Sequence, residues 1–178
     1  MRKHIMTALA MTLVTILCTC GRVTAQEKAP IRVAIVGLVH GHAHGLFRML
    51  PDIQSVKLVS IYEPQKDLVE QYSKQYHLEA IPVYNDLEKM LTEQKPDAVL
   101  VYSMIVDHRK IIEAAAKHGS SSMAEKPLAT TLEDGIAIRK AAREHTCTYS
   151  STTSRRGRQV VGSYTTKPPK ENWVTSAD

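Results

Sequence analysis

Short apolar runs alternate with amphipathic segments from residue 31 to about residue 145. The first run, Ile31–Val36, is rich in β-branched residues and ends at a glycine, which predicts a strand buried on both faces and followed by a tight turn. Similar runs predict four more strands, at residues 56–62, 81–84, 98–102 and 122–124. Pro82 has no N–H to donate to a ladder, so we expect its strand at a sheet edge.

Apolar residues at three- and four-residue spacing predict a helix after each strand. These helices are expected at residues 42–50, 64–72, 86–93, 106–118 and 131–145. Gly119 is suited to a left-handed cap, and Thr131 with Asp134 resembles a capping box. Because strand and helix alternate five times with short connections, we predict an α/β fold, a doubly wound parallel sheet of the Rossmann type.

The first 25 residues have the pattern of a secretory signal peptide. Arg2 and Lys3 precede an apolar stretch, residues 5–17, that is too short to span a bilayer, and small residues at 23–25 precede a cleavage point after Ala25. We therefore expect export, to the bacterial periplasm. A buried helix of the mature fold is the alternative.

The cysteines leave a second alternative open. Cys18 and Cys20 suggest a lipoprotein, although the small residues that usually precede a lipidated cysteine are missing. Cleavage after Ala25 would leave Cys147 alone, which excludes an intramolecular disulfide.

Charge and composition argue against a nucleic-acid partner. The net charge of +5 includes the leader and a C-terminal tail rich in Arg and Lys, and the chain holds one Phe and one Trp. A surface that stacks on bases needs aromatic side chains among the basic ones. We therefore expect no nucleic-acid binding and no stable membrane span.

The turn after the first strand is the expected nucleotide site. In a doubly wound sheet the ligand crevice lies beyond the carboxyl ends of the strands, and phosphate binds at the following helix N-terminus. The glycine fingerprint would place glycines at 37, 39 and 42, which this chain matches only in part. The turn residues expected to contact the cofactor are Gly37, Val39, His40, Gly41 and His42. Alternatively, Gly37 and Gly41 only permit a tight turn.

Glu63 ends the second strand, about where a Rossmann domain holds the ribose hydroxyls of NAD. A carboxylate there disfavours the extra phosphate of NADP. The cofactor is therefore expected to be NAD or NADP, with NAD favoured. A solvated turn residue beside Pro64 is the alternative.

Three alternating histidines require a metal site to be considered. His40 and His44 would share one helical face, and His42 lies between them. Because no third ligand is apparent in the sequence, we predict no metal. The histidines are expected to cap the turn or to line the nucleotide crevice.

The tripeptide Glu125-Lys126-Pro127 follows the fifth strand and is the most specific motif. It resembles the E-K-P motif of the Gfo/Idh/MocA oxidoreductases, and the resemblance extends over residues 31–145. It includes residues 95–99, His108 and residues 128–134.

This resemblance implies a cofactor domain in which Lys126 lies beside the nicotinamide and the substrate. Lys126 is then the catalytic residue, assisting a hydroxyl that loses hydride and proton. The cofactor contacts implied on this side are Ser103, His108, Glu125, Lys126 and Pro127. The substrate class implied is a sugar or polyol, oxidised at a CH–OH group. Val39 and residues 103–107 depart from the family pattern, which puts cofactor affinity in doubt.

The regular pattern stops at about residue 146. Residues 147–178 are polar, then basic, then proline-containing, so we expect a disordered or aberrant tail. The family's second domain, which supplies most of the substrate pocket, has no counterpart there.

One hypothesis is a frame displacement, since shifted codons allow residues 151–157 to be read as N-Y-E-S-T-W. A non-catalytic nucleotide-binding or interaction module is the alternative function, and the oligomeric state is left open.

Overall fold

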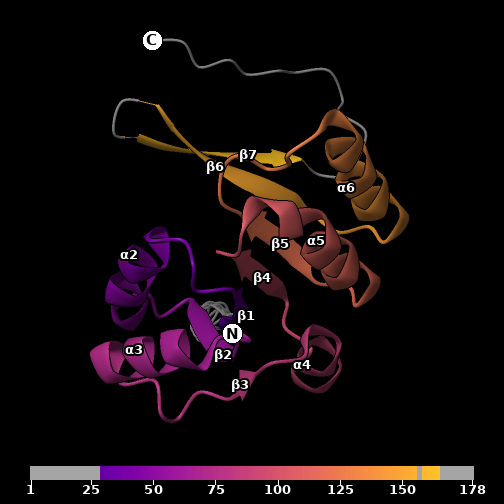
Figure 1. Ribbon diagram of the computed structural model, residues 1–178. Coiled ribbons are helices and arrows are strands. Elements are labelled where there is room, and N and C mark those ends of the chain that lie inside the picture. The colour runs from indigo at the N-terminus through magenta and orange to yellow at the C-terminus, as the bar shows by residue number, and fades with distance from the viewer. Residues whose placement is uncertain (1–28, 156–157, 165–178) are drawn as a thin grey trace, which may run out of the picture.

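The computed structural model describes residues 29–155 and 158–164, and the described strands form one sheet (Figure 1). The sheet order is β3-β2-β1-β4-β5-β6-β7. The strands are β1 (Ile31–Val36), β2 (Val56–Tyr62), β3 (Val83–Tyr84), β4 (Ala98–Val101), β5 (Ser121–Ala124), β6 (Tyr149–Arg155) and β7 (Arg158–Tyr164). The first six pair in parallel, and β7 runs antiparallel to β6. The predicted doubly wound sheet is confirmed, with β3 at an edge.

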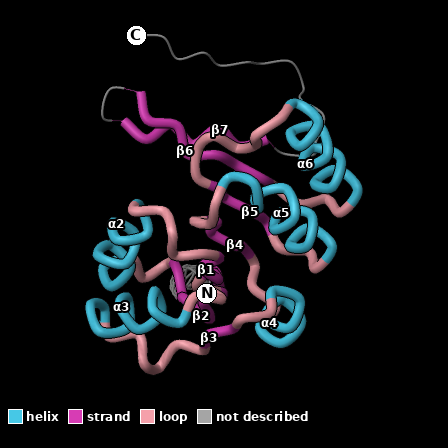
Figure 2. The backbone as a smooth tube through the Cα atoms, viewed as in Figure 1, coloured by secondary structure: helices cyan, strands magenta, loops and turns pink. Residues whose placement is uncertain are grey.

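Helices cover both faces of the sheet, as Figure 2 shows. The helices α2 and α3 lie on one face, and α4, α5 and α6 lie on the other. Their bounds are α2 (His42–Met49), α3 (Lys66–Tyr76), α4 (Leu87–Gln94), α5 (His108–Lys117) and α6 (Leu132–Glu144). Two short 3-10 helices, η1 (Leu50–Asp52) and η2 (Ile105–Asp107), precede β2 and α5.

Strand β1 belongs to two cores because its side chains alternate between the faces of the sheet. Val33 and Ile35 pack with Phe47 of α2 on one face. Ala34 and Val36 join the core under α4, α5 and α6 on the other. A fully buried aliphatic side chain contributes about 1.5–3 kcal/mol, so a strand buried on both faces anchors the layers that position the site.

The sheet continues past residue 146, where we expected regular structure to stop. Backbone pairing joins Tyr149 to Ser122 and Ser151 to Ala124 in parallel register. Tyr149 is buried in the core under α5 and α6. The expectation of five strands is therefore wrong, since β6 and β7 both lie past residue 146. Strand β6 is rich in Ser and Thr and lacks the apolar run by which the other strands were recognised. Residues 165–178 and the expected leader lie outside the described residues.

The helix ends predicted at Gly119 and Thr131 are found, whereas α3 begins at Lys66 with Gln65 as its N-cap, so Pro64 is not its first residue. Gly119 has φ +77°, which confirms the left-handed cap. Thr131 caps α6, since its Oγ1 accepts a hydrogen bond from the Asp134 N–H at 3.1 Å. The Asp134 carboxylate accepts a hydrogen bond from the Thr131 hydroxyl at 2.8 Å. In a full capping box it would accept from the Thr131 backbone N–H, so only half of the box forms. Among the described residues, no helix has the length and apolarity needed to cross a membrane.

Candidate functional site

The turn between β1 and α2 lies directly against the segment that follows β4. Gly37 has φ +85°, and a Cβ there would lie 2.6 Å from the Ser103 Cα. The Gly37 N–H donates to the Tyr62 carbonyl at 2.8 Å, and the His40 N–H donates to the Tyr102 carbonyl at 3.0 Å. Gly37 is thus required both by its conformation and by the close approach of the backbone. Neighbouring strands hold the turn on both sides.

Gly41 leaves the start of α2 open. A Cβ at Gly41 would meet no heavy atom within 4 Å, and within the described part of the chain no side chain caps this helix. An open helix N-terminus favours anionic groups such as phosphate. The turn therefore has the free approach that a pyrophosphate needs, although Val39 and His42 replace two fingerprint glycines. Val39 itself is exposed beside it.

Glu63 is buried at the end of β2, with 4% of its surface exposed. Its Oε2 accepts the Leu38 N–H at 2.8 Å, and its Oε1 accepts the Gln65 N–H at 2.9 Å. The alternative of a solvated turn residue is therefore wrong. Each carboxylate oxygen has a second lone pair, so Glu63 can hold the glycine turn in place and still accept a ribose hydroxyl.

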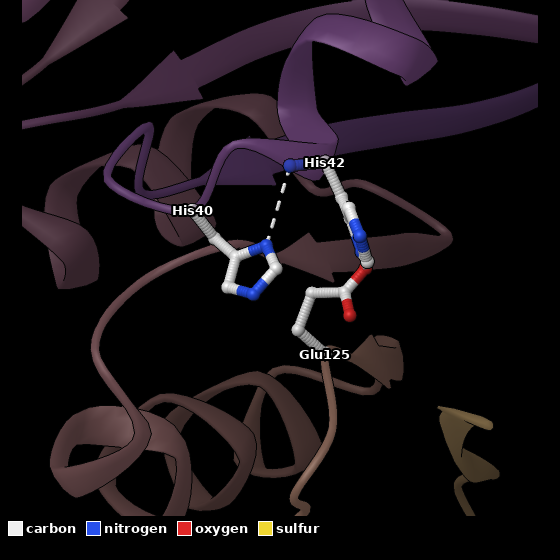
Figure 3. Close-up of side chains that lie close together, drawn as sticks. All are labelled: His40, His42 and Glu125. Atoms are coloured by element: carbon white, nitrogen blue, oxygen red, sulfur yellow. Dashed lines mark hydrogen bonds and ion pairs between the residues drawn. The ribbon is translucent and has the colours of Figure 1, made fainter. Parts of the chain in front are cut away.

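Glu125 and two histidines of the turn come together at the carboxyl ends of the strands (Figure 3). Glu125 Oε1 lies 3.0 Å from His42 Nδ1. His40 Nδ1 accepts the His42 N–H at 3.3 Å, and the two rings meet edge-on with centroids 4.6 Å apart. His44 instead stacks on Tyr72 at 4.5 Å. His40 and His44 were expected to share one helical face, but His40 instead contacts His42.

A crevice of about 760 Å³ opens beside this cluster, between α2, α3 and the ends of β4 and β5. His42, Glu125 and Tyr102 line it. Burial, reinforced by the negative charge of Glu125, raises the pKa of Tyr102 to about 12. The Tyr102 hydroxyl therefore stays protonated near neutral pH. Sequence reasoning missed Tyr102 because it looked like the last apolar residue of a strand.

His108 lies beneath the loop that carries Lys126 rather than in the crevice. It is fully buried, and its Nδ1 lies 3.2 Å from the Leu128 carbonyl oxygen. Burial lowers the pKa of His108, opposed by hydrogen bonding to the backbone of Leu128, Ser103 and Pro127. The residue thus ties the segment after β4 to the segment after β5.

Lys126 is exposed at the carboxyl end of β5 and is followed by Pro127, which is also exposed. The Lys126 N–H lies 3.3 Å from Glu125 Oε2. Ser103, whose hydroxyl donates to the Met104 carbonyl at 3.3 Å, lies at the end of the neighbouring strand. The predicted site residues therefore lie at the carboxyl ends of the strands, and His108 is buried under the loop that follows Lys126.

Comparison with known proteins identifies the family. The model of the oxidoreductase family with an NAD-binding Rossmann fold matches residues 31–153. Inositol 2-dehydrogenase/D-chiro-inositol 3-dehydrogenase of Halalkalibacterium halodurans is 32% identical over 116 residues, covering 65% of this chain and 33% of the relative. The NAD(+) scyllo-inositol 2-dehydrogenase of Bacillus subtilis is 28% identical over 115 residues, 64% of this chain and 33% of the relative.

A solved structure shows the same fold. Scyllo-inositol dehydrogenase from Lactobacillus casei, with bound NAD(H) and scyllo-inositol, matches with a TM-score of 0.58 and 22% identity, covering 68% of this chain and 36% of that one. The chain spans about a third of the length of the curated relatives it matches. The family match also includes most of β6, past the boundary at residue 146. The chain therefore belongs to the Gfo/Idh/MocA oxidoreductase family, and residues 31–153 are its NAD-binding Rossmann domain.

Proposed function

We propose that this domain serves an oxidoreductase that uses NAD to oxidise a CH–OH group of a sugar or polyol. The observation that carries the proposal is the position of three groups at the carboxyl ends of parallel strands. Gly37 follows β1, Glu63 follows β2, and Lys126 lies just beyond β5. In a sheet of this kind, the phosphate, ribose and nicotinamide groups of a dinucleotide bind at the carboxyl ends of the strands.

The residues present fit NAD. The start of α2 and the Gly41 backbone would receive the pyrophosphate, and Glu63 would accept a ribose hydroxyl. The negative charge of Glu63 disfavours the additional phosphate of NADP. Bound NAD would supply the hydride acceptor.

Lys126 is the group proposed to act on the substrate hydroxyl. It is exposed beyond β5, where its amine can hydrogen-bond the oxygen and take up its proton as the carbon loses hydride. Two of the relatives are inositol dehydrogenases, and inositol is a polyol. The substrate class proposed here follows from that similarity.

The reaction is tested by incubating the chain with NAD⁺ and a panel of inositols and following NADH formation. Because most of the family's substrate pocket lies in a second domain, we expect the chain alone to bind NADH, and any turnover that it shows should be lost in Lys126→Ala. The exposed Lys140 of α6 provides a matched control, and Lys140→Ala should not change the rate. Equal turnover by Lys126→Ala and the wild type would exclude the proposed role. Turnover of any inositol by the chain alone would count against the alternative, a non-catalytic nucleotide-binding module.

We further propose that the chain is exported. The basic start, the short apolar stretch and the small residues before Gln26 support this. Expression of the whole chain in a bacterium, followed by N-terminal sequencing of the periplasmic fraction, should find Gln26 as the first residue. Full-length protein confined to the cytoplasm would contradict export.

A further inference from the structure

We propose that His40, His42 and Glu125 form a binding site for a divalent transition-metal ion of the zinc or cobalt class. The sequence placed His40 and His44 on one helical face without a third ligand, whereas the fold brings His40 to His42 and supplies Glu125 from a distant segment. The cluster combines two nitrogen donors and one carboxylate, a set that holds catalytic zinc with coordination positions left open.

The distances fit such a site. The potential ligand atoms of the three side chains all lie within 4.8 Å of one another, and His42 Nδ1 is already 3.0 Å from Glu125 Oε1. Ligand atoms at about 2.0–2.2 Å from a tetrahedral metal ion lie about 3.4 Å apart. Small side-chain rotations therefore complete the set, without movement of the backbone.

The backbone holds both segments of the cluster in place. The His40 N–H donates to the Tyr102 carbonyl at 3.0 Å, and the Glu125 N–H donates to the Val101 carbonyl at 3.1 Å. Both segments are thereby tied to the end of β4. A site whose ligands are fixed before binding loses less conformational entropy when the metal ion enters.

The burial of the ligands favours a cation. Glu125 has 3% of its side-chain surface exposed, whereas His42 has 61%. The Glu125 carboxylate already contacts His42 Nδ1 and the Lys126 N–H, and a divalent ion would add positive charge that further offsets its lost hydration. The exposed His42 gives the ion a path from solvent, and the crevice beside it leaves room for a further oxygen ligand.

The donor atoms also select the class of ion. Imidazole nitrogen suits zinc, cobalt, nickel, copper and iron, whereas magnesium and calcium prefer ligand sets made of oxygen. We therefore expect Zn²⁺ and Co²⁺ to bind and Mg²⁺ to bind weakly at best. This selectivity separates the site from a magnesium ion that accompanies a nucleotide phosphate.

The test is a titration of the full chain, without a polyhistidine tag and without nucleotide, with Zn²⁺ by calorimetry and with Co²⁺ by visible absorption. The wild type should bind one equivalent. His42→Ala should weaken binding more than about 100-fold, because even residues that only support metal ligands contribute 10–100-fold. His40→Ala and Glu125→Gln should have the same effect.

A second histidine–carboxylate pair provides matched controls. His118 Nε2 lies 2.8 Å from Glu88 Oε2 on the surface, so His118→Ala and Glu88→Gln should leave metal binding unchanged. His42→Ala carries the test because its exposed side chain is not needed for folding, which thermal unfolding in metal-free buffer checks. Absence of stoichiometric binding by the wild type would overturn the proposal, as would equal binding by the wild type and His42→Ala.

Discussion

At the scale of a single residue, the first position of the turn after β1 requires glycine. Its φ of +85° and the Ser103 backbone, which would lie 2.6 Å from an added Cβ, both act against substitution. Gly37→Ala should therefore lower the free energy of unfolding by at least about 1–3 kcal/mol from backbone strain alone. Denaturation in urea measures the change.

Gly45, inside α2, is the matched control for Gly37. A Cβ at Gly45 would meet no heavy atom of the described residues within 4 Å, and alanine favours a helix over glycine by about 0.8–1.0 kcal/mol. Gly45→Ala should therefore stabilise the protein slightly. If the two variants have the same stability, the close packing of Gly37 against Ser103 is contradicted.

His108 should make stability depend on pH in a defined window. Burial lowers its pKa in the folded state, so below the unfolded value of about 6.5 the unfolded chain binds a proton that the folded chain does not. The contribution to stability is complete above about pH 6.5 and is lost as the pH falls towards the folded pKa. The slope is at most about 1.4 kcal/mol per pH unit for one proton.

His108→Asn should flatten this dependence, as urea denaturation between about pH 5 and 7.5 would show. Asp134 does not interfere, because hydrogen bonds from Thr131 and Thr130, together with Arg109, lower its pKa. Its effect is confined to pH values below about 5. An unchanged slope in His108→Asn would assign the pH dependence to other groups.

At the scale of the element, the cap of α6 allows a direct test. The Thr131 hydroxyl accepts the Asp134 N–H at 3.1 Å, and loss of such a cap costs about 0.5–2 kcal/mol. Thr131→Ala should therefore lower the unfolding free energy by about 1 kcal/mol. Thr131→Ser keeps the hydroxyl and should keep nearly all of the stability, whereas an equal loss in both variants would contradict the cap.

The bounds of an element were predicted correctly where its own apolar side chains determine the structure. The strand at residues 56–62 has the predicted bounds, because Ile61 packs into one core and Tyr62 packs against the other. Strand β6 was missed because hydroxyl side chains are common in loops, and its pairing with β5 and β7, together with the burial of Tyr149, makes it a strand. The helix expected at residues 42–50 ends at Met49, and Pro51 lies in the short 3-10 helix that follows.

At the scale of the whole molecule, the residues that the sequence proposed as a site lie together at the carboxyl ends of the strands, but the sequence did not predict the contacts among them. The contact between His42 and Glu125 joins segments far apart in the chain, and no local pattern encodes their distance. The hydrogen bonds of Glu63 to the turn were hidden for the same reason, since an acidic residue before proline is equally common in solvent. The sheet topology converts these separate motifs into one site.

Gly37, Glu63 and Lys126, at the carboxyl ends of β1, β2 and β5, are proposed to bind NAD together. Calorimetric titration of the purified chain with NADH tests this proposal most directly, with NADPH as the matched ligand. We predict saturable binding of one NADH per chain and weaker binding of NADPH, because the buried Glu63 carboxylate opposes the additional phosphate. Absence of NADH binding at millimolar concentration, by a chain shown to be folded, would contradict the account.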